Sequence, residues 1–475
     1  MTKTARPVLN DRVTTWRAQV EARLRQAVLV ALAAVVVVGV PSIVYPLTTP
    51  VSAEPGAAPL PPAETPDALV AAVAPGLAGL TASAAATRVA LDPRLVVAAA
   101  GRDPASYDDP VAEALTRLAG QDPAVVRAFF AGLPAAVTEW AAVLFPSAIG
   151  NLEGAPYPAR IAANRLRLTA ETVRPSTPDV PMWTPPWALA GTPYADFFAG
   201  AADRGHDLIY FDPVANNGQG SWAEVIGDLT SATRVGILVP GGSASVVSDN
   251  FIRYALRARS FVDAPEAAGK LAVIVWAGAD FPSGWLQEGL AGYAEKAAPR
   301  LASFSRDLRA RLAPGVPVIA IGHSYGGPVV GLAETRGLDA DVILQLASAG
   351  SGHGVTDVHQ YDAPCRTRYS MTAPADLIGY VQGSGDAPGI GHGLDPDEMP
   401  GTILLDSGFH VADPNAPDDI GRPIGALAGT EIRGIHAHSE VFNPRSDAWV
   451  NILAVLTGGA VVLKPGGQPP AVEGC

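Results

Sequence analysis

The stretch "VIAIGHSYGG", Val318–Gly327, decides the fold. Its first four residues are apolar and mostly β-branched, as in a strand buried inside a parallel sheet. Ser324 follows between Gly322 and Gly326, and the next segment, "GPVVGLAETR", is typical of a helix. The sequence therefore predicts a buried strand, a tight turn at Ser324 and a helix that starts directly after the turn.

Short apolar segments alternate with helical segments through residues 186–475, which we take as one domain. Strands that alternate with helices predict an α/β fold, in which helices cover both faces of a mostly parallel sheet. The predicted strands are "DLIYFDP" from Asp207, "RVGILVP" from Arg234, "LAVIVWA" from Leu271, "VPVIAIG" from Val316, "DVILQLA" from Asp341 and "RYSMTAP" from Arg368.

The turn at Ser324 has the pattern G-x-S-x-G. In α/β-hydrolases this pattern places a nucleophilic serine between a strand and a helix, and the glycines allow the strained backbone and close helix packing. We therefore predict Ser324 as a nucleophile, with Gly322, His323 and Gly326 forming the turn. The alternative is an ordinary loop serine in a glycine-rich connection between a strand and a helix.

A serine nucleophile needs an imidazole base and a carboxylate that orients the imidazole. In this fold the order along the chain is serine, acid, histidine. Asp376 follows the predicted strand "RYSMTAP" and is the predicted acid, although it could instead cap the segment "LIGYVQ". His438, in "HAHSEVF", is the predicted base, and His436 is its local rival.

An oxyanion hole needs two backbone N–H groups that point to the developing negative charge. The residue after the nucleophile, Tyr325, should supply one of them. The other should come from Gly241, Gly242 or Ser243, since these residues end the predicted strand in "ILVPGGSASV". An ordinary glycine turn is the alternative interpretation of this loop.

The N-terminal part is organised differently. Residues 1–26 are basic and residues 27–47 are apolar over a length that can cross a membrane, so we expect a cytoplasmic segment and a transmembrane anchor. A cleaved signal peptide is the alternative. Residues 48–66 are rich in Pro and Ala and predict a linker. In residues 67–185 we predict a helical region, in which "LDP", "RDP" and "QDP" start helices.

Charge and cysteine content limit the possible partners. Lys and Arg number 33 against 46 Asp and Glu, and no basic patch is visible, so we expect no nucleic acid partner. We also expect no metal and no cofactor. The two cysteines, Cys365 and Cys475, are candidates for a disulfide if the domain lies outside the cytoplasm.

Several motifs resemble one family in the order in which they occur. They are "PSAIGNLEGAPYPARIAANRL" from Pro146, "LVPGGSAS", "VIVWAGADFP", "IGHSYGGPVVGLA", "GHGLDP" and "HSEVF". Together they resemble the α/β-hydrolase family catalogued as domain of unknown function 1023, which is typical of actinobacteria. The resemblance implies an α/β-hydrolase fold behind a helical region, with Ser324, Asp376 and His438 at the triad positions. It implies no substrate, and Glu153 and Ala155 depart from the residues more usual in that family.

The functional expectation is a membrane-anchored serine hydrolase that faces outward. An esterase or lipase that acts on a small-molecule or lipid ester fits the predicted triad best. Two alternatives stay open at this point. One is a catalytically idle scaffold that serves as an envelope interaction protein, and the other is a peptidase or amidase that uses the same triad.

Overall fold

The computed structural model describes residues 65–173, 206–246, 248–383 and 386–475. The expected cytoplasmic segment, the expected anchor at 27–47 and nearly all of the expected linker lie outside these ranges. Within them, no helix combines the length and the apolar composition that crossing a membrane requires.

One eight-stranded sheet organises the C-terminal part, with strand order β1-β2-β4-β3-β5-β6-β7-β8. β2 pairs in antiparallel fashion with β1 and β4, and all other neighbours are parallel. This confirms the mostly parallel sheet. The strands are β1 (Asp207–Asp212), β2 (Ser221–Ile226), β3 (Arg234–Val239), β4 (Leu271–Ala277), β5 (Val318–His323), β6 (Val342–Leu346), β7 (Thr367–Met371) and β8 (Thr402–Leu404).

All six strands predicted from apolar segments are present, and two further strands were not predicted. β2 was missed because Glu224 interrupts its apolar pattern. That carboxylate is buried and lies 2.6 Å from Nδ1 of His206, so a polar residue occupies a core position because it has a polar partner. β8 has only three residues at the edge of the sheet, which is too short for a pattern.

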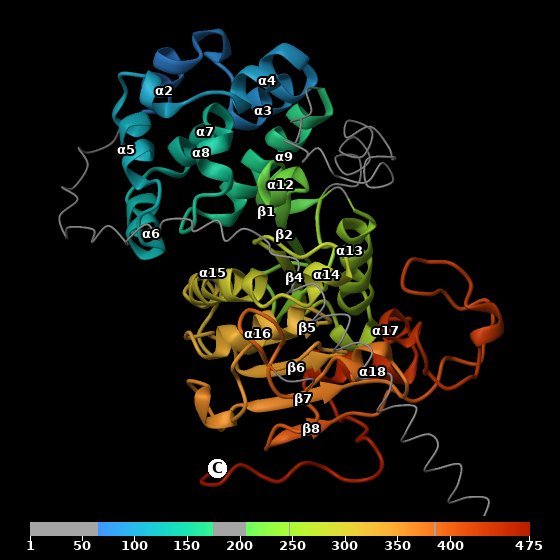
Figure 1. The fold of residues 1–475 in the computed structure, drawn as a ribbon. Helices are drawn as coiled ribbons and strands as arrows, with labels where there is room; N and C mark the ends of the chain where they lie inside the picture. Colours follow the sequence, from blue (N-terminus) through green and yellow to red (C-terminus); the bar gives the residue numbers. More distant parts are fainter. Residues whose placement is uncertain (1–64, 174–205, 247, 384–385) are drawn as a thin grey trace, which may run out of the picture.

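Two pairs of helices cover the sheet. α15 packs against α16, and α13 packs against α18 through the stacked rings of Phe261 and Trp449. Figure 1 shows the first pair to the left of the strands and the second pair to the right. The helices of this part are α12 (Ala215–Gly218), α13 (Asp249–Val262), α14 (Trp285–Glu288), α15 (Gly292–Arg309), α16 (Gly326–Glu334), α17 (Ala437–Glu440) and α18 (Asp447–Thr457), with short 3₁₀ turns η3 (Pro265–Ala267), η4 (Val358–Gln360), η5 (Leu377–Tyr380) and η6 (Gly425–Leu427).

The helical N-terminal region has a hydrophobic core of its own. As predicted, Asp92, Asp103 and Asp122 cap helical turns that begin with proline. The helices are α2 (Pro66–Val73), α3 (Ala82–Leu91), α4 (Pro93–Ala100), α5 (Pro110–Leu118), α6 (Pro123–Ala131), α7 (Ala135–Leu144), α8 (Pro146–Gly150) and α9 (Tyr157–Val173), with 3₁₀ turns η1 (Pro75–Leu77) and η2 (Pro104–Ser106).

This helical region covers the β1 edge of the sheet (Figure 1). The buried amide of Asn164 on α9 donates hydrogen bonds to the carbonyls of Gly150 and Leu208, and Asn151 exchanges two hydrogen bonds with the backbone of Phe211. An open sheet edge presents unpaired backbone groups, and these amide side chains satisfy part of them. The helical region therefore closes one edge of the sheet.

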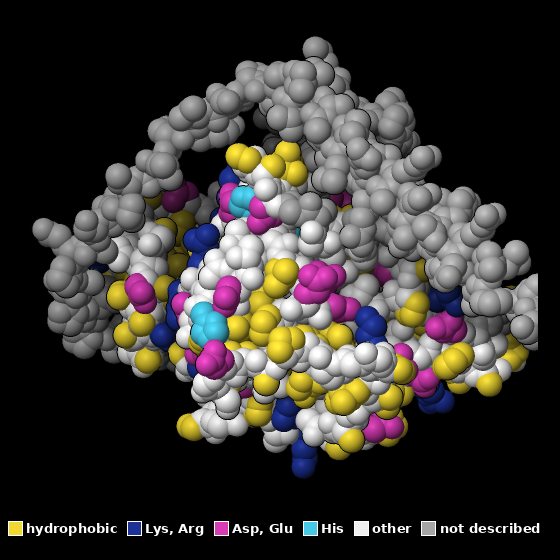
Figure 2. Space-filling view, turned by 60° about the horizontal axis from the view of Figure 1, so that its bottom comes forward, with side chains coloured by type: hydrophobic (Ala, Val, Ile, Leu, Met, Phe, Trp, Pro, Cys, Tyr) yellow, Lys and Arg dark blue, Asp and Glu magenta, His cyan; other side chains and the backbone are white. Residues whose placement is uncertain are grey.

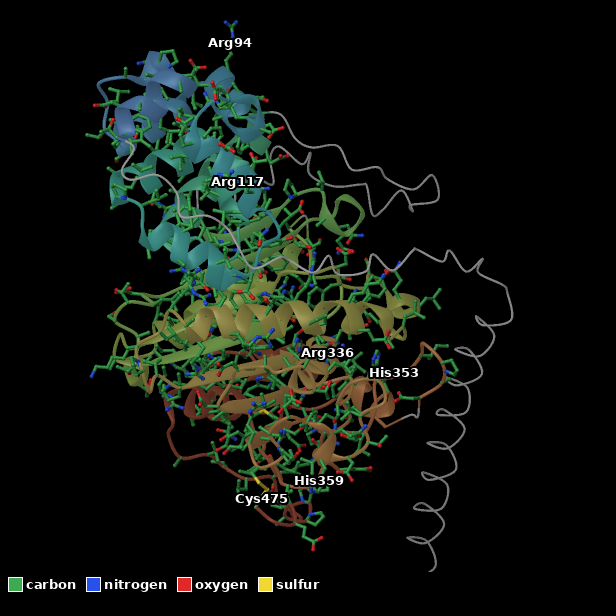
Figure 3. All side chains as sticks on the ribbon, turned by 90° about the vertical axis from the view of Figure 1, so that its left-hand side faces the viewer. Arg94, Arg117, Arg336, His353, His359 and Cys475 are labelled. Atoms are coloured by element: carbon green, nitrogen blue, oxygen red, sulfur yellow. A yellow bond between two sulfur atoms is a disulfide. The ribbon has the colours of Figure 1, made fainter. Side chains whose placement is uncertain are left out.

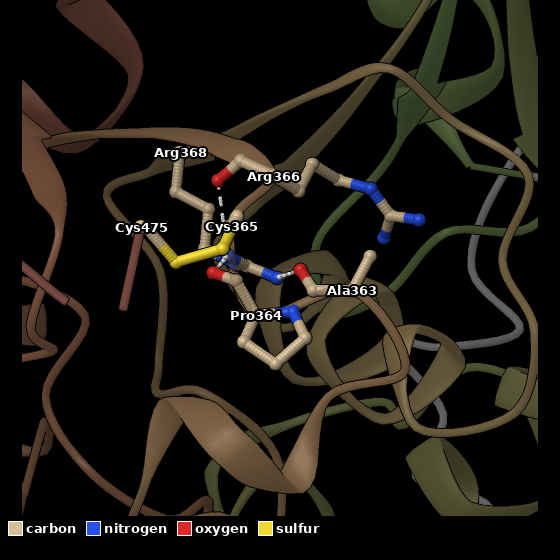
Figure 4. The surroundings of a disulfide bond; sticks show 6 residues. All are labelled: Ala363, Pro364, Cys365, Arg366, Arg368 and Cys475. Carbon is tan, nitrogen blue, oxygen red and sulfur yellow. Dashed lines mark hydrogen bonds between the residues drawn. A yellow bond between two sulfur atoms is a disulfide. The ribbon is translucent and has the colours of Figure 1, made fainter. Parts of the chain in front are cut away.

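The opposite end of the molecule is fixed by a disulfide between Cys365 and Cys475, whose Cα atoms are 5.4 Å apart. Figure 4 shows Arg368 beside it, donating hydrogen bonds to the carbonyls of the turn that carries Cys365. The tail also follows β8, where Lys464 N–H donates to the carbonyl of Leu404. Figure 3 shows Cys475 and the helical region at opposite ends.

Candidate active site

Ser324 sits on a strained turn between β5 and α16. Its φ is +56°, a left-handed conformation that few residues other than glycine adopt. A Cβ atom at Gly322 would lie 2.6 Å from the carbonyl oxygen of Gly326, and one at Gly326 would lie 2.3 Å from that of Val239. Only glycine fits at both positions. The side chain of Ser324 is partly exposed, whereas His323 and Tyr325 on either side are buried.

Asp376 and His438 form a hydrogen-bonded pair. Nδ1 of His438 lies 3.0 Å from Oδ2 of Asp376, and the Asp376 side chain is buried. The other oxygen of Asp376 accepts a hydrogen bond from the N–H of Ile378 and caps η5. The sequence allowed Asp376 to be either a helix cap or the partner of the histidine, and the structure shows both contacts. One oxygen caps η5 and the other lies against the imidazole of His438.

Ser324 and His438 do not form a direct hydrogen bond within the described part of the chain. The His438 ring instead packs against His323, the residue before Ser324, with ring centroids 4.8 Å apart. Hydrogen bonds of catalytic groups are often long without substrate and shorten in the reactive complex. The structure thus brings the imidazole of His438 to the residue next to Ser324, and its Nε2 has no hydrogen-bond partner among the described residues.

The rival residues lie elsewhere. His436 is exposed, at the start of α17. His392 donates from Nε2 to the carbonyl of Glu288, and burial lowers its pKa. Among the other carboxylates between Ser324 and His438, Asp395 and Asp406 accept hydrogen bonds from nearby backbone N–H groups. Asp376 is the carboxylate that contacts His438.

His323 joins three parts of the site through a chain of hydrogen bonds that the sequence did not predict. Gly241 N–H donates to the hydroxyl of Tyr254 at 2.9 Å, and this hydroxyl lies 2.6 Å from Nδ1 of His323. Nε2 of His323 lies 2.8 Å from the backbone carbonyl of His438. A carbonyl only accepts, so Nε2 carries the proton and Nδ1 accepts from Tyr254.

The environment of His323 favours this neutral form. Burial, together with the positive charges of His438 and Arg257, holds the pKa of His323 well below its ordinary value. His323 therefore holds the backbone of His438, the predicted base. The histidine between Gly322 and Ser324 was the one feature of the sequence that could have indicated this contact.

The loop after β3 lies directly against Ser324. Val239 is the register partner of Gly322 across β3 and β5, so the two strands end side by side. A Cβ atom at Gly241 would lie 2.7 Å from Cβ and 3.1 Å from Oγ of Ser324. Glycine at 241 therefore allows the loop to approach the predicted nucleophile.

The N–H groups of this loop differ in their hydrogen bonding, which bears on the choice of the second predicted oxyanion donor. Gly241 N–H is bound to the Tyr254 hydroxyl, and Ser243 N–H donates to the carbonyl of Pro282 at 2.6 Å. Neither is available to an oxyanion in this arrangement. The backbone N–H groups of Gly242 and Tyr325 have no acceptor among the described residues. The backbone N–H groups of Gly242 and Tyr325 are therefore the two candidate donors of the oxyanion hole.

Glu288 adds a carboxylate that the sequence did not predict. A Cβ atom at Gly242 would lie 2.1 Å from Oε1 of Glu288, so the carboxylate lies against the candidate oxyanion loop. Burial raises the pKa of Glu288, and the charge of His438 partly offsets this. No Lys or Arg of the described ranges forms an ion pair with it. Its position on a four-residue helix gives no motif by which it could have been found.

The described residues contain no group of three His, Cys, Asp or Glu side chains that could hold a metal ion.

Part of the chain is similar to a known protein family. Residues 215–384 match a family model described as an alpha/beta hydrolase. The fold is an α/β-hydrolase fold. The matched hydrolase segment contains the Ser324 turn, Asp376 and the loop at Gly241, and His438 follows it. The narrower family that the sequence resembles stays a prediction.

The curated relatives of this chain are distant. Two uncharacterized proteins from strains of Mycobacterium tuberculosis are 27% identical over 278 residues, which is 50% of this chain and 41% of theirs. The chain thus spans less than half of the length of these relatives.

Several solved structures are similar to part of this chain. They include an α/β serine hydrolase without a lid from Xanthomonas campestris, with 17% identity, a TM-score of 0.23 and coverage of 34% of this chain and 68% of that one. An esterase domain from a Rhodothermus marinus protein has 14% identity, a TM-score of 0.23 and coverage of 41% and 85%.

Proposed function

We propose that this α/β-hydrolase is a serine hydrolase that cleaves carboxylic esters through an acyl-enzyme. The observation that carries the proposal is the pairing of His438 with the buried carboxylate of Asp376, next to a turn that holds a serine in a left-handed conformation. A serine hydroxyl needs such a pair to lose its proton near neutral pH. The substrate is proposed to be a small-molecule or lipid ester.

The residues take the following roles in this proposal. Oγ of Ser324 attacks the ester carbonyl while Nε2 of His438 accepts its proton, and Asp376 orients the ring and stabilises the imidazolium. The N–H groups of Gly242 and Tyr325 stabilise the oxyanion. His438 then returns the proton to the leaving alcohol, and a water molecule, activated in the same way, hydrolyses the acyl-enzyme.

Two other functions use the same fold. A peptidase or amidase would need the same three side chains, so the choice between ester and amide depends on measured rates. An idle scaffold would leave the strain at Ser324 without a purpose, since strained backbone conformations concentrate at functional sites. We therefore place the esterase first and the idle scaffold second.

We also propose that residues 27–47 anchor the protein and that the hydrolase domain faces outward. The basic segment before the apolar run supports this orientation. The disulfide between Cys365 and Cys475 supports it independently, because disulfides persist in oxidising compartments outside the cytoplasm.

The test is active-site labelling with a fluorophosphonate, combined with hydrolysis of p-nitrophenyl acetate by the full chain. The wild-type protein should be labelled at one residue, and Ser324→Ala should lose both labelling and turnover. Ser283→Ala, which changes an exposed serine, is the matched control and should keep both. A folded wild-type protein that fails to react with probes of several sizes would favour the idle scaffold.

A further inference from the structure

A cleft of about 600 Å³ lies between the helical region and the sheet. The loop before α6, the turn before α9, the strands β1, β2 and β4, and helix α15 contribute its walls. α6 and α15 lie next to each other at this junction, where Arg127 and Asp307 form an ion pair (Figure 1). The described lining includes no residue of the Ser324 turn, the Gly241–Ser243 loop or α17. We call this space the junction cleft.

One wall of the junction cleft is aromatic. Trp276 at the end of β4 and Phe304 on α15 are buried, with ring centroids 6.2 Å apart, and Tyr210 of β1 lies at the same cleft. Aromatic walls of this kind bind the flat or apolar body of a small molecule. The volume is also in the range of ligand sites.

Arg160 supplies an unpaired charge to the junction cleft. Arg160 is only 2% exposed, and its Nη1 has no hydrogen-bond partner in the part of the chain that the structure describes. Among the described residues its guanidinium makes one hydrogen bond, a long one of 3.4 Å from Nε to the carbonyl of Gly150. A guanidinium stays protonated, and a buried charge without a carboxylate partner is costly. An anionic ligand would remove this cost.

A second guanidinium lies at the rim. Arg300 of α15 is exposed, forms no ion pair with a described residue and donates only to the carbonyl of Gly278, at 3.4 Å. Two acidic side chains also line the junction cleft. Asp122 is occupied as the cap of α6, and Glu153 accepts a 3.4 Å hydrogen bond from Ser303. Neither forms an ion pair with Arg160 or Arg300, although the charges of Glu153 and Asp307 favour the Arg160 cation and the Tyr157 ring centroid lies 5.7 Å from its guanidinium carbon. Both guanidinium groups therefore lack an ion-paired carboxylate among the described residues.

We propose that the junction cleft binds a small organic anion. Its carboxylate or phosphate group would pair with Arg160 and Arg300, whose planar forks match these groups, and its flat or apolar body would lie against Trp276 and Phe304. The motif "GNLEGAPYPAR", which the hydrolase site does not use, supplies Glu153 and Arg160 to this second site. The proposal does not depend on the hydrolase activity.

The test is isothermal titration of the full chain with benzoate and with phenyl phosphate. Benzyl alcohol and benzylamine, which have the same ring without the negative charge, serve as control ligands. At least one of the two anions should bind, and the better of them identifies the ligand as a carboxylate or a phosphate. Arg300→Met should weaken binding at least about tenfold, because a charged hydrogen bond is lost.

Control variants make the result specific. Arg94→Met changes an exposed arginine at the tip of the helical region (Figure 3) and should leave the affinity unchanged. Arg160→Met should abolish binding, with a circular dichroism spectrum to verify folding. If it does not fold, the Arg300→Met result decides. Absence of binding by both anions, equal binding of benzyl alcohol, or an unchanged affinity in Arg300→Met would overturn the proposal.

Discussion

The two carboxylate oxygens of Asp376 make different contacts, one structural and one with the proposed base. Oδ1 caps η5 through Ile378 N–H, and Oδ2 holds Nδ1 of His438. The hydrogen bond from Ile378 N–H sets the orientation of the Asp376 carboxylate, and the carboxylate in turn orients the imidazole ring of His438. Asparagine caps helices as well as aspartate does, so a substitution can separate the two roles.

Asp376→Asn should keep the fold and lower kcat by about 10⁴-fold, because the amide favours the wrong tautomer of His438. The measurement is turnover of p-nitrophenyl acetate, with circular dichroism to verify folding. Asp406→Asn, which changes a carboxylate that does not contact His438, is the control and should stay near the wild-type rate. A wild-type rate in Asp376→Asn would assign the acid role to another carboxylate.

Glu288 should make the site select substrates by charge. The carboxylate lies against Gly242 without a described cationic partner, so it should favour an ester that carries an ammonium group over a neutral ester of the same shape. Glu288→Gln should reduce this preference in kcat/KM by about tenfold, the effect of one partly screened charge. Glu266→Gln, at an exposed position, should leave the preference unchanged.

The preference should also depend on pH with a defined sign. Because burial raises the pKa of Glu288, its charge is present above that raised pKa and is lost as the pH falls through it. The wild-type preference should therefore disappear at a higher pH than an ordinary glutamate would give. A preference that stays constant down to the ordinary glutamate range would contradict this role.

At the scale of elements, His323 connects β5 to α13 and α17. Its two nitrogens contact Tyr254 on α13 and the backbone of His438 on α17. Only the neutral ring can accept the hydrogen bond from Tyr254 at Nδ1 while it donates from Nε2. Burial and the charges of His438 and Arg257 hold its pKa well below the ordinary value. In the unfolded chain the ring should titrate near pH 6.5.

The stability of the fold should therefore fall as the pH drops below about 6.5. In this window the unfolded chain takes up a proton at His323 and the folded chain does not, which costs up to about 1.4 kcal/mol per pH unit. Urea unfolding between pH 7.5 and about 5 measures the slope. His323→Gln, which cannot titrate, should show a smaller slope, and equal slopes in the two proteins would contradict the assignment.

The elements also show how far the sequence predicts the site. The turn at Ser324 was predictable because its signals are local, an apolar strand followed by glycines within ten residues of chain. The hydrogen bond of Gly241 N–H was not predictable, because its acceptor is the hydroxyl of Tyr254 on α13, which no local motif links to the glycine loop. Glu288 escaped prediction for the same reason, since only the folded chain brings α14 to Gly242. Residue type and order predict the candidate triad, whereas hydrogen-bond partners depend on packing between distant elements.

At the scale of the whole molecule, other parts of the chain cover both edge strands of the sheet. The helical region closes the β1 edge of the sheet, and the tail runs along β8 to the disulfide. On the face in Figure 2, acidic and basic side chains are interspersed rather than gathered by sign. The junction cleft lies at the first of these edges, so a ligand there would contact both the helical region and the sheet.

The proposed topology is the prediction that concerns the molecule as a whole. Residues 27–47 should span the membrane with the hydrolase domain outside, since the basic residues lie before the apolar run and the cysteines form a disulfide. A protease added to intact cells should remove the hydrolase domain and leave a cytoplasmic control protein intact. The domain should also remain with the membrane fraction until detergent is added, whereas a cleaved signal peptide would release it. Survival of the domain under conditions that digest an exposed control would place it on the cytoplasmic side, and the disulfide would then need a different explanation.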